Sequence, residues 1–145
     1  MTASVPAPLP TAASRLRAPV LCAAGVLAAT ALLYARDPHR PGSYGFCPWN
    51  ALTGGYCPGC GGLRAVHDLT HGDLAAAASS NLLVVALLPA AVLLWATWSR
   101  ARWQDRPFRV RGSVLSARPA LWSLAGVVLA FTALRNLDLG AWLAP

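Results

Sequence analysis

Three of the four cysteines lie in one short stretch of the chain, with a spacing that suits metal binding or thiol chemistry. Cys57 and Cys60 belong to a Cys-Pro-Gly-Cys-Gly motif, and Cys47 lies a short distance before them. A gap of two residues lets both thiolates reach one tetrahedral ion, and the glycine after the second cysteine permits the turn that aims backbone N–H groups at sulfur. We therefore expect Cys57 and Cys60 to be ligands of an ion such as Zn²⁺, with Cys47 as a third ligand.

Two histidines after the motif are candidates for the fourth ligand. His67 and His71 are spaced i, i+4, and on a helix that begins near Cys60 they share a face with Cys60 and Arg64. Two imidazoles on that face can converge on one ion. A solvated helix face explains the same spacing, and on it Arg64 and Asp68 are placed to form an i, i+4 ion pair. We expect Arg64 either to orient the thiolates electrostatically or to pair with Asp68.

The same cysteines admit two other interpretations. A cysteine at a helix start has a lowered pKa, and Arg64 would lower it further, so Cys57 and Cys60 are also a candidate pair for a thiol–disulfide oxidoreductase. A structural disulfide from Cys47 to Cys57 or Cys60 is the third interpretation. Carboxylate acid–base catalysis is disfavoured, because the chain has five scattered Asp and no Glu. The preferred interpretation is a structural or partner-binding site without catalytic residues, and Cys22 is expected to be a packing residue in an apolar run.

The composition places this site in a membrane protein. Of the 145 residues, 56 % are hydrophobic and 12 % are charged, whereas a soluble domain carries roughly 25 % charged residues. The apolar content is also too high for a disordered chain. A net charge of +7 raises the question of nucleic acid, but the arginines flank apolar runs, which favours membrane-edge anchoring. We expect a lipid bilayer as partner and no nucleic acid, and the Arg-only, Ala-rich usage indicates a bacterial source.

Three apolar runs predict an all-α integral membrane protein with about three transmembrane helices, and with a Cys-rich loop and a short amphipathic helix between the first two. In chain order, we expect a disordered tail (1–17), the first span (18–35), the loop (36–62), the amphipathic helix (63–72), the second span (73–99), a basic cytoplasmic linker (100–113), the third span (114–136) and a C-terminal tail (137–145). Asp73 and Asn81 are alternative N-caps of the second span, and Pro89 predicts a kink in it.

The distribution of arginine predicts how the spans are oriented. The N-terminal tail and the linker before the third span hold eight Arg and one Asp, whereas the segments on the other side hold four Arg and four Asp. The positive-inside rule then places the N-terminus in the cytoplasm of a bacterial cell and the Cys loop outside or in the outer interface. A transport component is a further alternative. It would require a homo-oligomer or a membrane-protein partner, because three helices are too few to enclose a path.

The cysteine segment resembles a family of small bacterial membrane proteins known as domain of unknown function 2752. The resemblance rests on Cys-Pro at 47–48, Cys-Pro-Gly-Cys-Gly-Gly-Leu-Arg-Ala at 57–65, His-Gly-Asp-Leu at 71–74 and Asn81, and Arg135-Asn136 also looks similar. The family pattern has Thr where Leu63 stands, so a hydroxyl is missing here, and Pro where Leu82 stands, which alters how a helix starts. Because the family has no established activity, the resemblance implies the architecture and the motif but no reaction.

Overall fold

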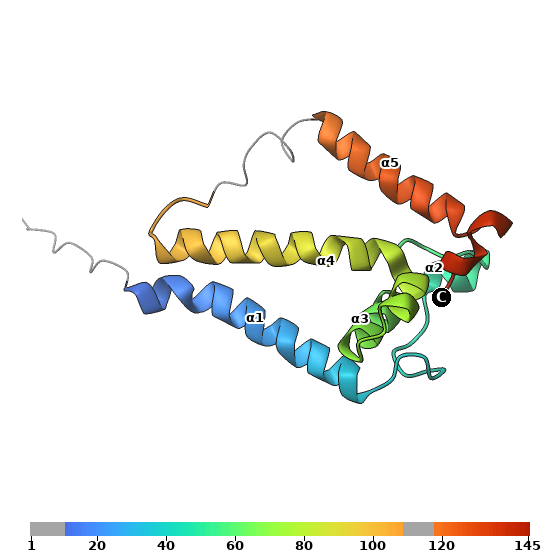
Figure 1. Cartoon of the computed structure of the whole chain (residues 1–145), viewed down its shortest axis with the longest axis horizontal. Coiled ribbons are helices and arrows are strands. Elements are labelled where there is room, and N and C mark those ends of the chain that lie inside the picture. The colour runs from blue at the N-terminus through green and yellow to red at the C-terminus, as the bar shows by residue number, and fades with distance from the viewer. Residues whose placement is uncertain (1–10, 109–117) are drawn as a thin grey trace, which may run out of the picture.

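The computed structural model describes residues 11–108 and 118–145, and the regular elements of this part of the chain are all helices, without strands (Figure 1). The all-α prediction is confirmed. The elements are α1 (Ala12–Ala35), α2 (Pro48–Thr53), α3 (Gly62–Thr70), α4 (Leu74–Trp103), α5 (Arg118–Leu134) and the 3-10 helix η1 (Asp138–Leu143).

Two of these helices, α1 and α4, are long and apolar enough to cross a membrane. Protein buries only 11 % of the apolar window of α1 and 17 % of that of α4. A core helix of a soluble protein would be mostly covered, so these apolar surfaces are suited to contact with lipid. α5 is apolar but shorter, and it is the weaker candidate for a third span.

α1 begins earlier than the hydropathy pattern indicated. The side chain of Thr11 caps the helix by accepting a hydrogen bond from the backbone N–H of Ser14 at 3.3 Å. The helix therefore includes residues 12–17, which the sequence assigned to the tail. The rest of that expected tail, residues 1–10, lies outside the described residues, as do residues 109–117 of the expected linker and third span.

α4 uses both of the N-caps that the sequence offered. The Asp73 carboxylate accepts from Ala76 N–H at 2.8 Å, and the Asn81 side chain accepts from Val84 N–H at 3.0 Å. Asn81 itself has a non-helical backbone, with φ −163° and ψ 92°. A short first segment and a long apolar segment thus meet at Asn81, whereas the sequence placed the kink at Pro89.

The expected loop and C-terminal tail also contain helical structure. α2 lies inside the loop, with Pro48 in its first turn and Gly54 in a left-handed conformation after its last residue, the usual signals for a helix start and end. η1 lies inside the expected tail, where Leu143 is only 2 % exposed. Residues 137–145 therefore form part of the packed structure.

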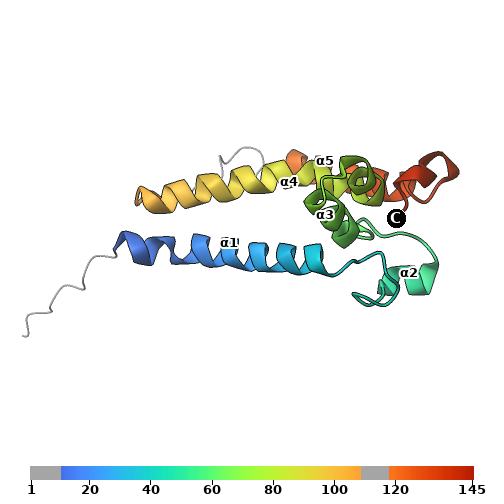
Figure 2. The same cartoon turned by 60° about the horizontal axis from the view of Figure 1, so that its bottom comes forward.

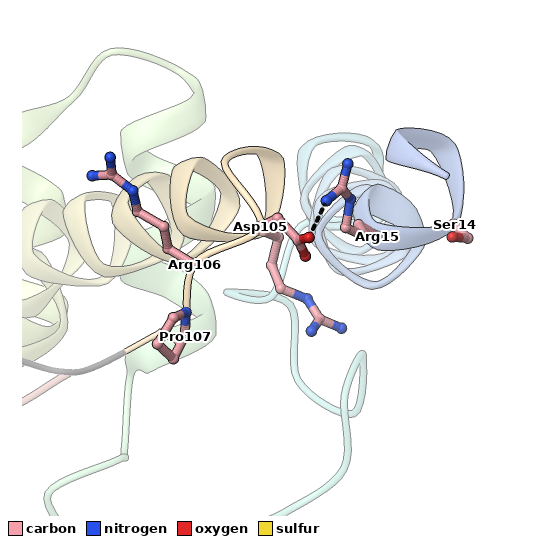
Figure 3. A pocket seen from close by; sticks show the side chains of 6 residues that line it. Ser14, Arg15, Asp105, Arg106 and Pro107 are labelled. Carbon is pink, nitrogen blue, oxygen red and sulfur yellow. Dashed lines mark ion pairs between the residues drawn. The ribbon is translucent and has the colours of Figure 1, made fainter. Parts of the chain in front are cut away.

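The packed structure is concentrated at one end of the molecule. Figures 1 and 2 show α1 and α4 running side by side, with α2, α3 and η1 gathered at one end of the pair. α3 contacts both α1 and α4 there. At the opposite end, Arg15 Nη1 lies 2.8 Å from Asp105 Oδ2, and this ion pair joins the start of α1 to the residues that follow α4 (Figure 3).

Candidate metal centre at the cysteine segment

The three cysteines of the segment converge. Cys57 Sγ lies 3.0 Å from Cys60 Sγ and 3.6 Å from Cys47 Sγ, and all three sulfur atoms lie within 4.8 Å of one another. Around a tetrahedral ion with Zn–S bonds of about 2.3 Å, neighbouring sulfur atoms are roughly 3.8 Å apart. All three cysteines are free thiols. The three thiols are a donor set for one soft metal ion, and Cys57 and Cys60 would bind it after moving apart by roughly 0.8 Å. Cys22 lies apart from the cluster, exposed on α1.

Short turns bring these thiols together. Cys47 is the residue that precedes α2, and Cys60 N–H donates to Cys57 O at 3.1 Å in a tight turn. Gly61 follows with φ +77°, the left-handed conformation that the motif predicts. A Cβ atom at Gly61 would collide with the backbone oxygen of Ser80 on α4. Glycine is thus required both by the backbone conformation and by the close approach of α4.

The surroundings give the thiols different acidities. A hydrogen bond from the backbone of Asn50, at the start of α2, lowers the pKa of the Cys47 thiol. Burial, and then the hydrogen bonds to the other two thiols, raises the pKa of Cys60 to about 12. The expectation that a helix start and Arg64 would make the motif thiols acidic is therefore wrong for Cys60. Without a metal ion, the Cys47 thiol is therefore more easily deprotonated than that of Cys60.

A buried arginine from the far end of the chain supports the segment. Arg135 is 1 % exposed. Its Nη1 donates to the carbonyl oxygens of Cys57 (3.0 Å) and Cys60 (3.1 Å), and its Nη2 donates to those of Ser80 (3.3 Å) and Leu143 (2.9 Å). One guanidinium therefore connects the motif to α4 and η1.

Two asparagines complete this support. Asn136 Oδ1 accepts from Tyr56 N–H at 2.7 Å and its Nδ2 donates to Tyr56 O at 2.8 Å. Asn81 Nδ2 donates to the carbonyl oxygens of Pro58 and Cys60, at 2.9 and 3.0 Å. Side chains thus satisfy a backbone that has no helix or sheet to pair with. Asn136 was expected only as part of a family pattern, and Asn81 also as a helix N-cap; the signal for the Asn136 role is the polar pair Arg135-Asn136 directly after an apolar run.

The two predicted histidines do not join the cysteines. His67 Nδ1 lies 2.6 Å from the carbonyl oxygen of Leu33, and its Nε2 lies 3.8 Å from Asp37. His71 stacks on the ring of Tyr34 with centroids 4.5 Å apart. Within residues 11–108 and 118–145, the cysteine cluster contains the three thiols and neither histidine.

Arg64 and Asp68 also have partners other than those predicted. Arg64 Nε donates to Pro38 O at 3.4 Å. Asp68 is buried, where it accepts a hydrogen bond from Ser80 Oγ at 3.0 Å and lies 3.5 Å from His39 Nε2. The described residues contain no Arg64–Asp68 ion pair. The reason is that α3 packs its Asp68 face against α4, while Arg64 points toward the loop after α1.

An open pocket of about 540 Å³ borders the cysteine cluster. Cys47, Cys60 and Arg64 line it, together with Leu63. If the three thiols held an ion, a fourth ligand could reach it through this pocket. The pocket also places one cationic side chain close to that position.

Comparison with known proteins identifies the segment that carries this centre. Residues 47–95 match the model of a family described as "Protein of unknown function (DUF2752)", a range that includes all three clustered cysteines, α3 and Asn81. No curated protein and no solved structure matches the chain. The resemblance to this family is confirmed: the match over residues 47–95 supports membership of this chain in the DUF2752 family, whose function is unknown.

Proposed function

We propose that this chain is a small integral membrane protein in which Cys47, Cys57 and Cys60 bind one Zn²⁺ ion at a structural or partner-binding site. The observation that carries the proposal is the convergence of the three sulfur atoms within 4.8 Å of one another. Thiolates are ligands that select Zn²⁺ among common divalent ions. A bound ion also deprotonates a coordinating thiol, so it would reverse the effect of burial on Cys60.

The support around the cysteines suits a metal site. Arg135 and Asn81 hold the carbonyl oxygens of the motif from outside the segment, which fixes the backbone before an ion arrives. Three protein ligands leave one position open on a tetrahedral ion. Because the pocket reaches Cys47 and Cys60, a water molecule or a side chain of a membrane-protein partner can occupy that position.

The proposed location of the chain is a bacterial cell membrane, with the cysteine cluster on its outer side. Arg15, Arg102 and Arg106 line one pocket, where the start of α1 meets the residues after α4 (Figure 3). This end of the helix pair is opposite to α2 and α3 (Figure 1). Cationic residues at one end of a set of spans favour the cytoplasmic side for that end. The N-terminus is then cytoplasmic, and the cysteine cluster is exterior or interfacial.

Elemental analysis of the full chain, purified in mild detergent without chelator, tests the metal proposal. We expect Cys57→Ser and Cys60→Ser to lower the zinc content by about one ion per chain relative to the wild type. Cys22→Ser is the matched control, because its thiol lies on α1 outside the cluster, and it should retain the wild-type content. Unchanged zinc in folded C57S and C60S variants would overturn the proposal.

A second measurement uses wild-type protein, so its result does not depend on whether the cysteine variants fold. Wild-type protein is stripped of metal and titrated with Co²⁺, and the near-ultraviolet absorption of thiolate–cobalt charge transfer is recorded. We expect this band to appear and to saturate. Binding of Co²⁺ without the band would place the metal on ligands other than these thiols.

Thiol–disulfide exchange is the second candidate function, and the 3.0 Å separation of Cys57 Sγ and Cys60 Sγ favours it. In such an exchange the two thiols lose their protons, a Cys57–Cys60 bond forms, and the two electrons and two protons convert a partner disulfide to two thiols. This candidate predicts metal-free protein with an oxidised pair. It also predicts folded single-cysteine variants that trap a mixed disulfide with the partner.

A further inference from the structure

A second group of metal-ligating side chains lies where the end of α1 meets α3. Asp37 and His39 are in the loop after α1, and His67 is on α3. Asp37 Oδ1 lies 2.9 Å from His39 Nδ1 and 3.8 Å from His67 Nε2, and the ligand atoms of the three residues all lie within 4.8 Å of one another. We infer that Asp37, His39 and His67 form a separate binding site for a divalent transition-metal ion.

The second ring nitrogen of each histidine already faces an acceptor. His67 Nδ1 lies 2.6 Å from Leu33 O, and His39 Nε2 lies 3.5 Å from Asp68 Oδ1. Metal-binding histidines usually donate their other N–H to a carbonyl or a carboxylate, which fixes the tautomer and the ring orientation. With an ion bound, that assignment would direct the lone pairs of His67 Nε2 and His39 Nδ1 to the ion; without one, His39 Nδ1 is hydrogen-bonded to Asp37 Oδ1 at 2.9 Å.

The acceptors that orient the two rings are themselves held in place. Leu33 is 8 % exposed in the last turns of α1, and Asp68 is 7 % exposed and accepts from Ser80 Oγ at 3.0 Å. Side chains held by such packing keep ligands in position before an ion binds. His39 and Asp37 remain accessible from solvent, with 42 % and 37 % of their side chains exposed, so an ion has a route to the site.

A local turn alone does not explain the cluster. Asp37 also accepts from the backbone N–H of His39 at 2.8 Å, and this turn accounts for the proximity of those two residues. It does not account for His67, which comes from another helix and aims Nε2 at the same carboxylate. The convergence of the loop after α1 with α3 on one carboxylate is the feature that points to an ion.

The ligand types distinguish this site from the cysteine cluster. Two imidazoles and one carboxylate suit Zn²⁺ or Fe²⁺ and leave coordination positions open, whereas three thiolates form a softer and more negative site. The two sites are close to each other, because Pro38, between Asp37 and His39, lines the pocket beside Cys60. The inference stands on its own geometry and does not rest on the function proposed for the cysteines.

Co²⁺ titration of the full chain in detergent tests this second site. We expect His39→Ala and Asp37→Asn to lose about one bound Co²⁺ per chain while the thiolate–cobalt charge-transfer band stays unchanged. Both substitutions are in an accessible loop, so the fold should be retained. His71→Ala is the matched control, because His71 lies next to His67 but outside the cluster, and it should bind as much Co²⁺ as the wild type.

The outcomes separate the two sites. Loss of the charge-transfer band in C57S and C60S, with the remaining cobalt sensitive to H39A, supports both. Folded H39A and D37N variants that bind the same amount of Co²⁺ as the wild type and H71A would overturn the second site, whatever the cysteine variants show.

Discussion

At the scale of single residues, Arg135 is the side chain that connects the cysteine segment to the rest of the fold. Its guanidinium supplies hydrogen bonds to four carbonyl oxygens. Arg135→Met keeps much of the apolar volume but leaves those carbonyls buried without this donor. Because each buried unsatisfied group costs roughly 1–3 kcal/mol, we expect the free energy of unfolding to fall by about 3 kcal/mol.

Thermal unfolding followed by tryptophan fluorescence in detergent measures this effect. Arg118→Met, at the exposed start of α5, is the matched control and should unfold close to the wild type. Increased reactivity of Cys57 and Cys60 toward a thiol reagent should accompany the loss of stability in R135M. Equal melting of R135M and R118M would show that Arg135 does not hold the segment.

The sequence revealed the site residues that lie close together along the chain, but not those that come from distant segments. Cys57 and Cys60 were predictable because metal-ligand spacing is a local pattern. His67 was predicted to be a fourth ligand of the cysteine cluster, but the structure places it beside Asp37 and His39, since helical spacing says which face it occupies and not what that face meets. Its neighbours Asp37 and His39 come from the loop after α1, and only the packing of α3 against α1 brings them to His67.

At the scale of elements, the junction between the cysteine turn and α4 depends on Gly61. Two effects oppose a side chain there: the positive φ, and the collision of a Cβ atom with Ser80 O. Gly72, after α3, has a similar φ of +81°, but a Cβ atom at this position would have no neighbour within 4 Å. We expect Gly72→Ala to cost about 1–2 kcal/mol from φ alone, and Gly61→Ala to cost clearly more because α4 must also move.

Chemical denaturation of the two variants in detergent measures the difference, and zinc content shows whether the cysteine cluster is displaced. G72A should keep wild-type zinc and G61A should lose part of it. If G61A is no more destabilised than G72A, the close approach of α4 to the motif is not a constraint on the site.

The helices themselves were largely predictable, but their ends and bends were not. Apolar runs revealed α1 and α4 because their length and hydropathy are properties of the sequence alone. The kink at Asn81 was not predictable from capping preference, since Asp73 and Asn81 looked like alternatives. Asn81 is held out of the helix by long-range hydrogen bonds to Pro58 and Cys60, and such bonds exist only after the cysteine segment has packed against α4.

At the scale of the whole molecule, the two ends of the helix pair differ in chemistry. One end carries the cysteine cluster and the Asp37, His39 and His67 cluster. The other carries the Arg15–Asp105 ion pair with further arginines around it. If the positive-inside rule governs insertion, both proposed metal sites face the exterior, where they meet extracytoplasmic metal ions and partners.

The absence of lysine from the sequence offers a direct test of this topology. Arg40→Lys and Arg106→Lys each introduce one lysine without changing the net charge or any cysteine. Arg40 is 82 % exposed in the loop that carries Asp37 and His39, and Arg106 is exposed just beyond α4.

A membrane-impermeant amine reagent is applied to intact cells that express each variant, and the modified residue is located by peptide mass spectrometry. We expect R40K to react in intact cells and R106K to react only after permeabilisation, because the arginine-rich end remains on the cytoplasmic side. The reverse pattern would place both clusters in the cytoplasm, and reaction of both variants in intact cells would contradict a membrane span between them.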